Sequence, residues 1–480
     1  MPFPTSETRR KGRIAGLIFA LVWLSCVWFG SWEWNPNNAT RLFASIAIVE
    51  DGEATIDRFA ALTVDKARFG DHHYLDKAPG VSLMAVPAVW FATVTGETSR
   101  YASLSPYDPV SGRFLRLRLK LATATTTALL TALAAALLFL IGRTLGGSMG
   151  AGAFAAIGFA LGTPMWGWST TLFGHAPVAA LFVIAIWAVW RGTAGERPSL
   201  GHAALAGGAL GWAVVIEYPA ALEGAAIGVW ALWRLRRAPT GYRWRAIAAA
   251  ALPALAAGLI LAAYNQFAFG TPFRLGYQGV VGFEGMQQGL FGLTYPKPRV
   301  LYEVVLGRHR GLIWIAPVLV LGLAGLVRLA WTRASRDIGV MALSGMLIVL
   351  VYNAAYFYWD GGNSTGPRHA VPAIAFLALG LAPGWAMARH AAARVAAVAL
   401  LALSVAINLA VASAEIASGG KGDFPLFSDV IADRFRNGEL RTLPSEWLGW
   451  SPWEGLALYL LIAALIGGGI VRTVARGESG

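Results

Sequence analysis

The chain of 480 residues contains a single cysteine, Cys26, and few charged residues, which make up 14% of the sequence. With one cysteine no intramolecular disulfide is possible, so cysteine usage does not indicate whether the protein faces an oxidising or a reducing compartment. Hydrophobic residues make up 56% of the chain, which leaves too little polar surface for a soluble protein of this length. The composition therefore predicts an integral membrane protein.

Acidic residues are also scarce, 26 against 39 lysines and arginines, and the formal net charge is +13. The basic residues lie in short clusters between apolar runs of about 20 residues, the length needed to cross a bilayer. The positive charge therefore indicates membrane topology, and we expect no nucleic-acid partner.

The apolar runs predict an all-α polytopic protein with about twelve transmembrane helices. The first run, Ile14 to about Trp32, follows a basic arm and lacks a small-residue cleavage site, so we expect it to stay attached. The basic connections alternate with acidic ones along the chain. The positive-inside rule then places the basic loops and both termini in the cytoplasm.

Nearly all acidic residues fall on the opposite, external face. We expect a single transmembrane domain, 1–480, with three long external loops at 33–116, 266–310 and 413–452. In the first loop, the apolar segment from Val81 to Val94 is short and contains Pro87. Counting it as a span would reverse the sidedness of every later basic loop, so we expect a juxtamembrane helix at the interface.

The first external loop interleaves carboxylates with lysine, histidine and tyrosine. A carboxylate can take a proton from an incoming hydroxyl or amine, and a fixed cation can hold a departing phosphate. The segment from Tyr74 to Gly80 supplies both signs at Asp76 and Lys77, followed by a Pro-Gly turn. Asp57 and Asp65 are further carboxylates of this loop. For each of these residues, a solvated loop charge is the alternative interpretation.

Other polar candidates lie where loops meet the apolar runs. Asn38 and Arg41 follow the first run, with Asn38 expected to cap a helix. Arg310 ends the second loop, where a guanidinium can bind phosphate in a bidentate manner. Arg368 and His369 follow a glycine-rich turn at an expected helix start, which favours an anion.

His175 lies near the end of an apolar run, where an ionisable group is costly unless it is paired or faces a wet cavity. A structural hydrogen-bonding role and a substrate-binding role are both open for it. Metal use is open as well, because loop carboxylates could hold a divalent ion or act without one. The adjacent His72 and His73 lack a third ligand at a recognisable spacing.

Four short motifs follow the first span in a fixed order: Tyr74–Gly80, Asn265–Phe273, Arg310–Leu312 and Gly366–His369. In this order and topology, most of the chain resembles bacterial membrane glycosyltransferases of the GT-C superfamily. The closest likeness is to the branch of protein O-mannosyltransferases and aminoarabinose lipid A transferases.

This resemblance implies a multi-pass enzyme of the cytoplasmic (inner) membrane with its active site on the periplasmic face. It would transfer a hexosyl or pentosyl group, with inversion, from a polyprenyl phosphate carrier to a glycan, lipid or protein acceptor. Lys77, beside Asp76, would meet the carrier phosphate, and Arg310 and Arg368 would be further phosphate or acceptor contacts. We expect Asn38, Arg41, Tyr74, His175 and His369 to bind substrate.

One difference between this sequence and that family concerns the catalytic base. Many relatives carry an acidic pair after the first span, whereas this chain has Asn37-Asn38. The catalytic base would then be Asp57 or Asp65, with Glu50 as a further candidate and Asp76 as orienter or alternative base. A transporter or flippase of a lipid-linked or anionic substrate, and a non-catalytic scaffold with this fold, are the alternatives.

Overall fold

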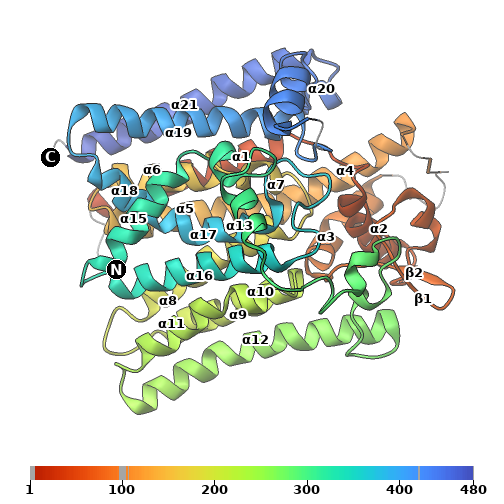
Figure 1. Cartoon of the computed structure of the whole chain (residues 1–480), viewed down its shortest axis with the longest axis horizontal. Coiled ribbons are helices and arrows are strands. Elements are labelled where there is room, and N and C mark those ends of the chain that lie inside the picture. Colours follow the sequence, from red (N-terminus) through yellow and green to blue (C-terminus); the bar gives the residue numbers. More distant parts are fainter. Residues whose placement is uncertain (1–5, 97–103, 106, 420–421, 479–480) are drawn as a thin grey trace.

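A computed structural model describes residues 6–96, 104–105, 107–419 and 422–478. It is mostly helical, and its long helices run side by side along the long axis of the molecule (Figure 1). The only sheet in the described ranges is a hairpin of β1 (Ala67–Phe69) and β2 (His72–Tyr74), with Phe69 opposite His72. The prediction of an all-α polytopic protein is confirmed.

Eight helical segments are long and apolar enough to cross a membrane. They are α1 (Ser6–Trp28), α4 with α5 (Pro109–Thr125, Thr127–Leu145), α8 (His175–Gly192), α12 (Thr240–Phe269), α16 (Arg336–Ala355), a segment over η5, α17, η6 and α18 (Arg368–Met387), α19 (Ala391–Ala414) and α21 (Pro452–Glu478). Four shorter apolar helices are α3 (Gly80–Thr95), α6 (Met149–Ala160), α9 (Leu200–Ile216) and α15 (Leu319–Trp331). The total of about twelve spans and their sidedness remain predictions.

Small residues allow some of these helices to pack closely. At Gly207 of α9, a Cβ atom would lie 1.9 Å from the carbonyl oxygen of Ala250 in α12. Any side chain at this position would therefore push the two helices apart. Such close backbone approach is typical of helix packing in membranes, where dispersion contacts replace the hydrophobic effect between helices.

The first external loop is largely structured. It contains α2 (Pro36–Glu50), a 3₁₀ turn (Asp57–Leu62), the β hairpin and α3. Helix α2 begins one turn earlier than expected, because Asn35 is its N-cap and Pro36 occupies the first helical position. The expectation that Asn38 caps a helix is therefore wrong.

Helix α3 matches the apolar segment that we expected to lie at the interface. One side of it is buried against α2 and α4, while Trp90 and Phe91 on the other side are 57% and 54% exposed. Exposed aromatic rings on a short apolar helix fit an interfacial position. The membrane depth of α3 remains a prediction.

Other short elements complete the bundle and its loops. They are α7 (Met165–Ser169), α10 (Ala220–Glu223), α11 (Ala225–Leu235), 3₁₀ turns at Gly276–Gly279 and Glu284–Gln287, α13 (Pro298–Val305), α14 (Leu312–Ile315), a π-helix at Leu426–Phe435 and α20 (Leu443–Trp447). The elements α2, β1 and β2 gather at the end of the molecule opposite to where α1 begins and α21 ends (Figure 1).

Candidate functional site

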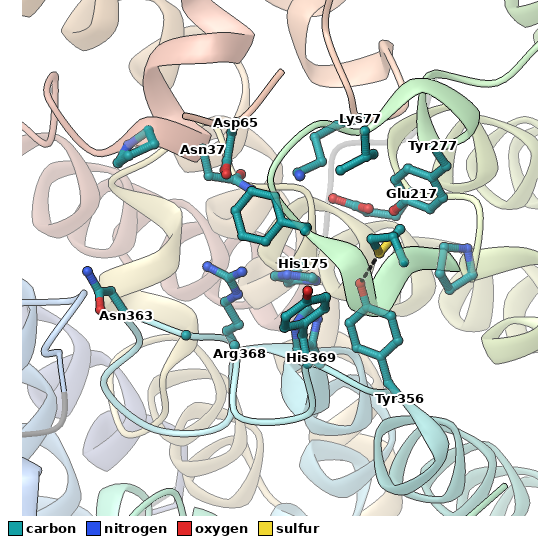
Figure 2. Close-up of a pocket in the computed structure, with 18 of the residues that line it drawn as sticks. Asn37, Asp65, Lys77, His175, Glu217, Tyr277, Tyr356, Asn363, Arg368 and His369 are labelled. Carbon is teal, nitrogen blue, oxygen red and sulfur yellow. Dashed lines mark hydrogen bonds between the residues drawn. The ribbon is translucent and has the colours of Figure 1, made fainter. Parts of the chain in front are cut away.

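A cavity of about 350 Å³ lies between the first external loop and the ends of several bundle helices. Its walls come from α2, the start of α8, the end of α9, the end of α16 and the glycine-rich segment before Arg368. Figure 2 shows polar side chains from all these segments pointing into one space. The cavity therefore gathers residues that are far apart in the sequence.

Lys77 lines this cavity and forms an ion pair with Asp76 beside it. Asp76 is fully buried, and its second carboxylate oxygen, Oδ1, has no hydrogen-bond partner among the described residues. Burial lowers the pKa of Lys77, but the carboxylates of Asp76 and Asp65 outweigh burial and raise it overall. Lys77 is therefore a fixed cation in the cavity wall.

Asp65 is the first-loop carboxylate that reaches the cavity directly. Its backbone N–H donates to Oγ1 of Thr63 at 3.1 Å, and that hydroxyl in turn donates to the carbonyl of Pro36, also at 3.1 Å. The loop is thereby attached to the start of α2. Within the described ranges, no hydrogen bond or ion pair engages the side chain of Asp65, although it is only 8% exposed.

Arg368 faces Asp65 and Lys77 across the cavity (Figure 2). Its guanidinium lies over the ring of Phe173, at 5.2 Å, and its Nε is buried with no hydrogen-bond partner in the described chain. Gly361 makes room for this side chain: its φ is +74°, and a Cβ there would lie 2.9 Å from Cγ of Arg368. The glycine-rich turn therefore positions the arginine.

Two histidines form the floor between these groups. The rings of His175 and His369 meet edge to face at 4.8 Å, and Tyr356 packs on His369 at 5.1 Å. Nε2 of His369 is buried and lacks a hydrogen-bond partner among the described residues. A buried polar atom without a partner is costly, so the cavity is suited to a polar ligand.

Arg41 also lines the cavity but is largely engaged by the protein. Its Nη2 lies 2.6 Å from Oε1 of Glu217, and its Nη1 donates to the side chain of Asn37. This buried pair ties α2 to the end of α9. Arg41 therefore holds the cavity wall in place while contributing positive charge to it.

Several predicted site residues lie outside the cavity. Asn38 uses its side chain within the protein: its amide donates to the carbonyl of Trp32 at 2.9 Å, and its oxygen accepts from the N–H of Leu172 at 2.8 Å. Tyr74 packs against the rings of Phe69 and Phe269 at 6.0 and 5.3 Å. Both side chains stabilise the loops around the cavity.

Asp57, a predicted base, also lies outside. Its carboxylate accepts from the backbone N–H of His73 at 2.6 Å and contacts Nδ1 of His72 at 2.6 Å. Burial acts to raise the pKa of Asp57, but these histidine contacts outweigh it and lower the pKa, and the pKa of His72 is raised by the same contact. Asp57 therefore attaches the 3₁₀ turn to strand β2 of the hairpin.

Arg310, a predicted phosphate ligand, is 2% exposed and does not line the cavity. Its Nε donates to the carbonyl of Asp360 at 3.0 Å and its Nη2 to that of Gly362 at 2.8 Å. Burial lowers its pKa to about 10. Arg310 thus holds the glycine-rich turn from behind, because backbone carbonyls occupy its donors.

Some cavity residues carried no signal in the sequence. Their side chains come from loop segments and helix ends without a recognisable motif: Tyr277, Tyr352 and Tyr356. Glu217 and Glu223 also line the cavity, and Glu217 is indicated in the sequence by its position at the end of an apolar run. In the described ranges, no cluster of three His, Cys, Asp or Glu side chains could hold a metal ion.

No protein-family model matches the sequence, and no curated protein is similar to it at a significant level. The fold, in contrast, is similar to that of a solved membrane enzyme, the ArnT of Cupriavidus metallidurans, crystallised with undecaprenyl phosphate bound. The TM-score is 0.51 at 16% sequence identity, and the match covers 96% of this chain and 73% of ArnT. The chain therefore shares the fold of this ArnT over nearly its whole length, as the resemblance in the sequence led us to expect.

Proposed function

We infer that the protein is a membrane glycosyltransferase that takes its sugar from a polyprenyl phosphate-linked donor. One observation carries this proposal: Lys77 and Arg368 point from two sides into a cavity whose polar atoms are only partly satisfied by the protein. Two fixed cations in a partly dry site are suited to a phosphate leaving group. The ArnT of the same fold was crystallised with undecaprenyl phosphate, which supports a polyprenyl carrier.

The roles follow from the positions of the side chains. Asp65 acts as the base and takes the proton from an acceptor hydroxyl or amine. The acceptor atom then forms a bond to the anomeric carbon while the bond from that carbon to the phosphate oxygen breaks. The electron pair leaves with the phosphate, whose charge Lys77 and Arg368 hold. A single displacement of this kind inverts the anomeric centre.

The same geometry suggests roles for the neighbours. Asp76 orients the ammonium of Lys77, and Arg41 with Glu217 fixes the wall beside it. His175 and His369 contact the donor headgroup or the sugar from the floor of the cavity. The active-site face is external, because the basic connections lie at the other ends of the helices. A glycan, lipid or protein is the acceptor.

A transfer assay tests this function against its alternatives. Purified protein in vesicles is incubated with radiolabelled polyprenyl phosphate sugars and a mixture of envelope acceptors. We expect label in the acceptor. Movement of the lipid across the vesicle without transfer would indicate a flippase, and neither result would indicate a scaffold.

The double variant Asp76→Asn/Lys77→Gln provides the residue-level test. Removing Lys77 alone would leave the buried Asp76 unpaired, whereas the double change keeps the site neutral and the fold intact. We expect transfer to fall by about 10²-fold or more, since a fixed charge at the leaving group is lost. Wild-type turnover by a folded double variant would refute the assignment of Lys77.

A further inference from the structure

A second cavity lies at the far end of the same helices that frame the external one. It is about 1010 Å³ in volume, and α16 lines it from Arg336 to Ile348, whereas Tyr352 near the other end of α16 lines the external cavity. Helix α16 has 20 residues and is about 30 Å long, the thickness of the hydrocarbon core. The two cavities therefore open toward opposite membrane surfaces.

The walls of this second cavity are apolar and run along the helices. Met341, Ser344 and Ile348 follow one another at helical spacing on α16, and Val229 with Trp233 lines the facing side on α11. Val229 is 67% exposed, and Val340, also in the lining, is 50% exposed. The cavity is thus a groove that opens sideways, where lipid chains surround the protein.

The mouth of the groove is basic. It is formed where α11 ends and α16 begins, and four arginines line it: Arg234, Arg237, Arg333 and Arg336. Asp337 is the only acidic side chain of this lining in the described chain, and Arg234 already pairs with it at 2.6 Å. The remaining arginines give the mouth an uncompensated positive charge.

These arginines retain donors for a ligand. Arg336 uses its Nε for the carbonyl of Ala330, at 3.3 Å, and its two terminal nitrogens have no partner among the described residues. Arg237 lies over the ring of Trp233 at 4.7 Å, a contact that holds the guanidinium plane at the groove edge. Guanidinium groups so placed match the oxygens of a phosphate.

We propose that this groove binds an acidic glycerophospholipid of the membrane leaflet opposite to the external cavity. The arginines take the phosphodiester headgroup, and the two apolar walls take the two acyl chains. Basic pockets between transmembrane helices at the cytoplasmic side are suited to anionic lipid headgroups, and this end of the helices carries the basic connections. This site is separate from the proposed transfer reaction and does not depend on it.

Native mass spectrometry of the full-length protein tests the proposal with three lipids. Dioleoyl phosphatidylglycerol is the probe, dioleoyl phosphatidylcholine has the same chains without net charge, and undecaprenyl phosphate represents the carrier. We expect phosphatidylglycerol to bind in the groove and phosphatidylcholine not to, whereas undecaprenyl phosphate binds at the external cavity and is unaffected by changes in the groove. The variant Arg333→Gln/Arg336→Gln should weaken that binding roughly 30-fold, since two basic residues near the headgroup are lost.

Two controls separate this site from general attraction to the surface. Arg389→Gln/Arg472→Gln removes the same charge from exposed arginines outside the groove and should leave binding unchanged. Ser344→Trp keeps every arginine but fills the groove, and it should abolish binding. Equal losses in both arginine pairs, equal binding of phosphatidylcholine, or a loss of undecaprenyl phosphate binding in Arg333→Gln/Arg336→Gln as large as that of phosphatidylglycerol would each overturn the proposal.

Discussion

Two arginines that the sequence marks as phosphate ligands lie in regions that differ in how their polar groups are satisfied. Arg310 lies behind the glycine-rich turn, where the carbonyls of Asp360 and Gly362 accept its hydrogen bonds. Arg368 lies at the front of the same turn, in the cavity, with Nε unpartnered within the described chain. The first arrangement stabilises the loops, whereas the second leaves binding capacity for a ligand.

The carboxylates of the first loop repeat this difference. Asp57 is bonded to His72 and His73 of the outer hairpin, whereas Asp65 faces the cavity and no described residue forms a hydrogen bond or ion pair with its carboxylate. Polar groups of the outer loops should therefore matter for stability, and those of the cavity for transfer. Four substitutions test this division.

Asp65→Asn should have the largest effect on turnover. The amide cannot take a proton from the acceptor, and loss of a general base lowers the rate by about 10³-fold. The thermal midpoint should change little, because no hydrogen bond or ion pair from a described residue engages this carboxylate. Steady-state transfer kinetics with a melting curve of the same preparation measure both quantities. Retained turnover would remove Asp65 from the mechanism.

Arg368→Gln should lower turnover by about 10²-fold, because one cation at the leaving phosphate is lost. Its stability should stay the same or rise, since a buried Nε atom without a hydrogen-bond partner among the described residues costs free energy. Arg368→Lys should recover part of the rate by restoring the charge. A large fall in the melting midpoint of Arg368→Gln would contradict the proposed division.

Arg310→Gln should show the opposite pattern. Two hydrogen bonds from a buried charged group are lost, so the free energy of unfolding should fall by about 3 kcal/mol. Turnover per folded molecule should fall less than in Arg368→Gln, through loosening of the turn. Chemical denaturation in detergent measures the first quantity, and transfer by the folded fraction measures the second. A stable but inactive variant would place Arg310 at the substrate.

Asp57→Asn should have the smallest effect, within about twofold on turnover, because the carboxylate is exposed and lies outside the cavity, at the 3₁₀ turn beside the hairpin. The contact with Asp57 raises the pKa of His72 above its ordinary 6.5. The stabilisation of the hairpin by this contact is therefore complete below pH 6.5 and is lost as the pH rises through the raised pKa of His72. The lowered pKa of Asp57 makes the contact fail at the acidic end as well, below its ordinary 3.8.

Amide hydrogen exchange of the β hairpin checks this pH dependence. Protection in the wild type should be highest between those two pH limits, and Asp57→Asn should remove the dependence. A pH-independent wild-type hairpin would show that the histidine contact does not form in solution.

The sequence predicted the architecture well because hydrophobic length and charge asymmetry act over whole segments. The apolar runs near His175 and Ala370 correspond to helices of the bundle, and Val81 to Val94 corresponds to α3. The first loop was harder to predict. Whether Asp57 or Asp65 faces the cavity depends on a hairpin of two three-residue strands and on the hydrogen bond from the Asp65 backbone to Thr63. Neither feature has a strong sequence signal.

Residues of the candidate site could be predicted only where a charged or ionisable side chain stood out from the sequence around it. Lys77 was identifiable from its acidic neighbour and the Pro-Gly turn, Arg368 from the glycine-rich turn before it, and His175 from its place near the end of an apolar run. Arg310 also lies where a loop meets an apolar run, but it is outside the cavity, since carbonyl partners 50 and 52 residues away are set by tertiary packing. Tyr277 and Tyr356 line the cavity without any motif, so composition gave no reason to select them.

Equilibrium binding of undecaprenyl phosphate to the purified protein tests the central claim most directly. Wild type, Arg368→Gln and Asp57→Asn are compared at equal pH and salt. The proposed phosphate site predicts that Arg368→Gln binds at least about tenfold more weakly, while Asp57→Asn binds like wild type. Wild-type affinity in Arg368→Gln, or an equal loss in both variants, would contradict it.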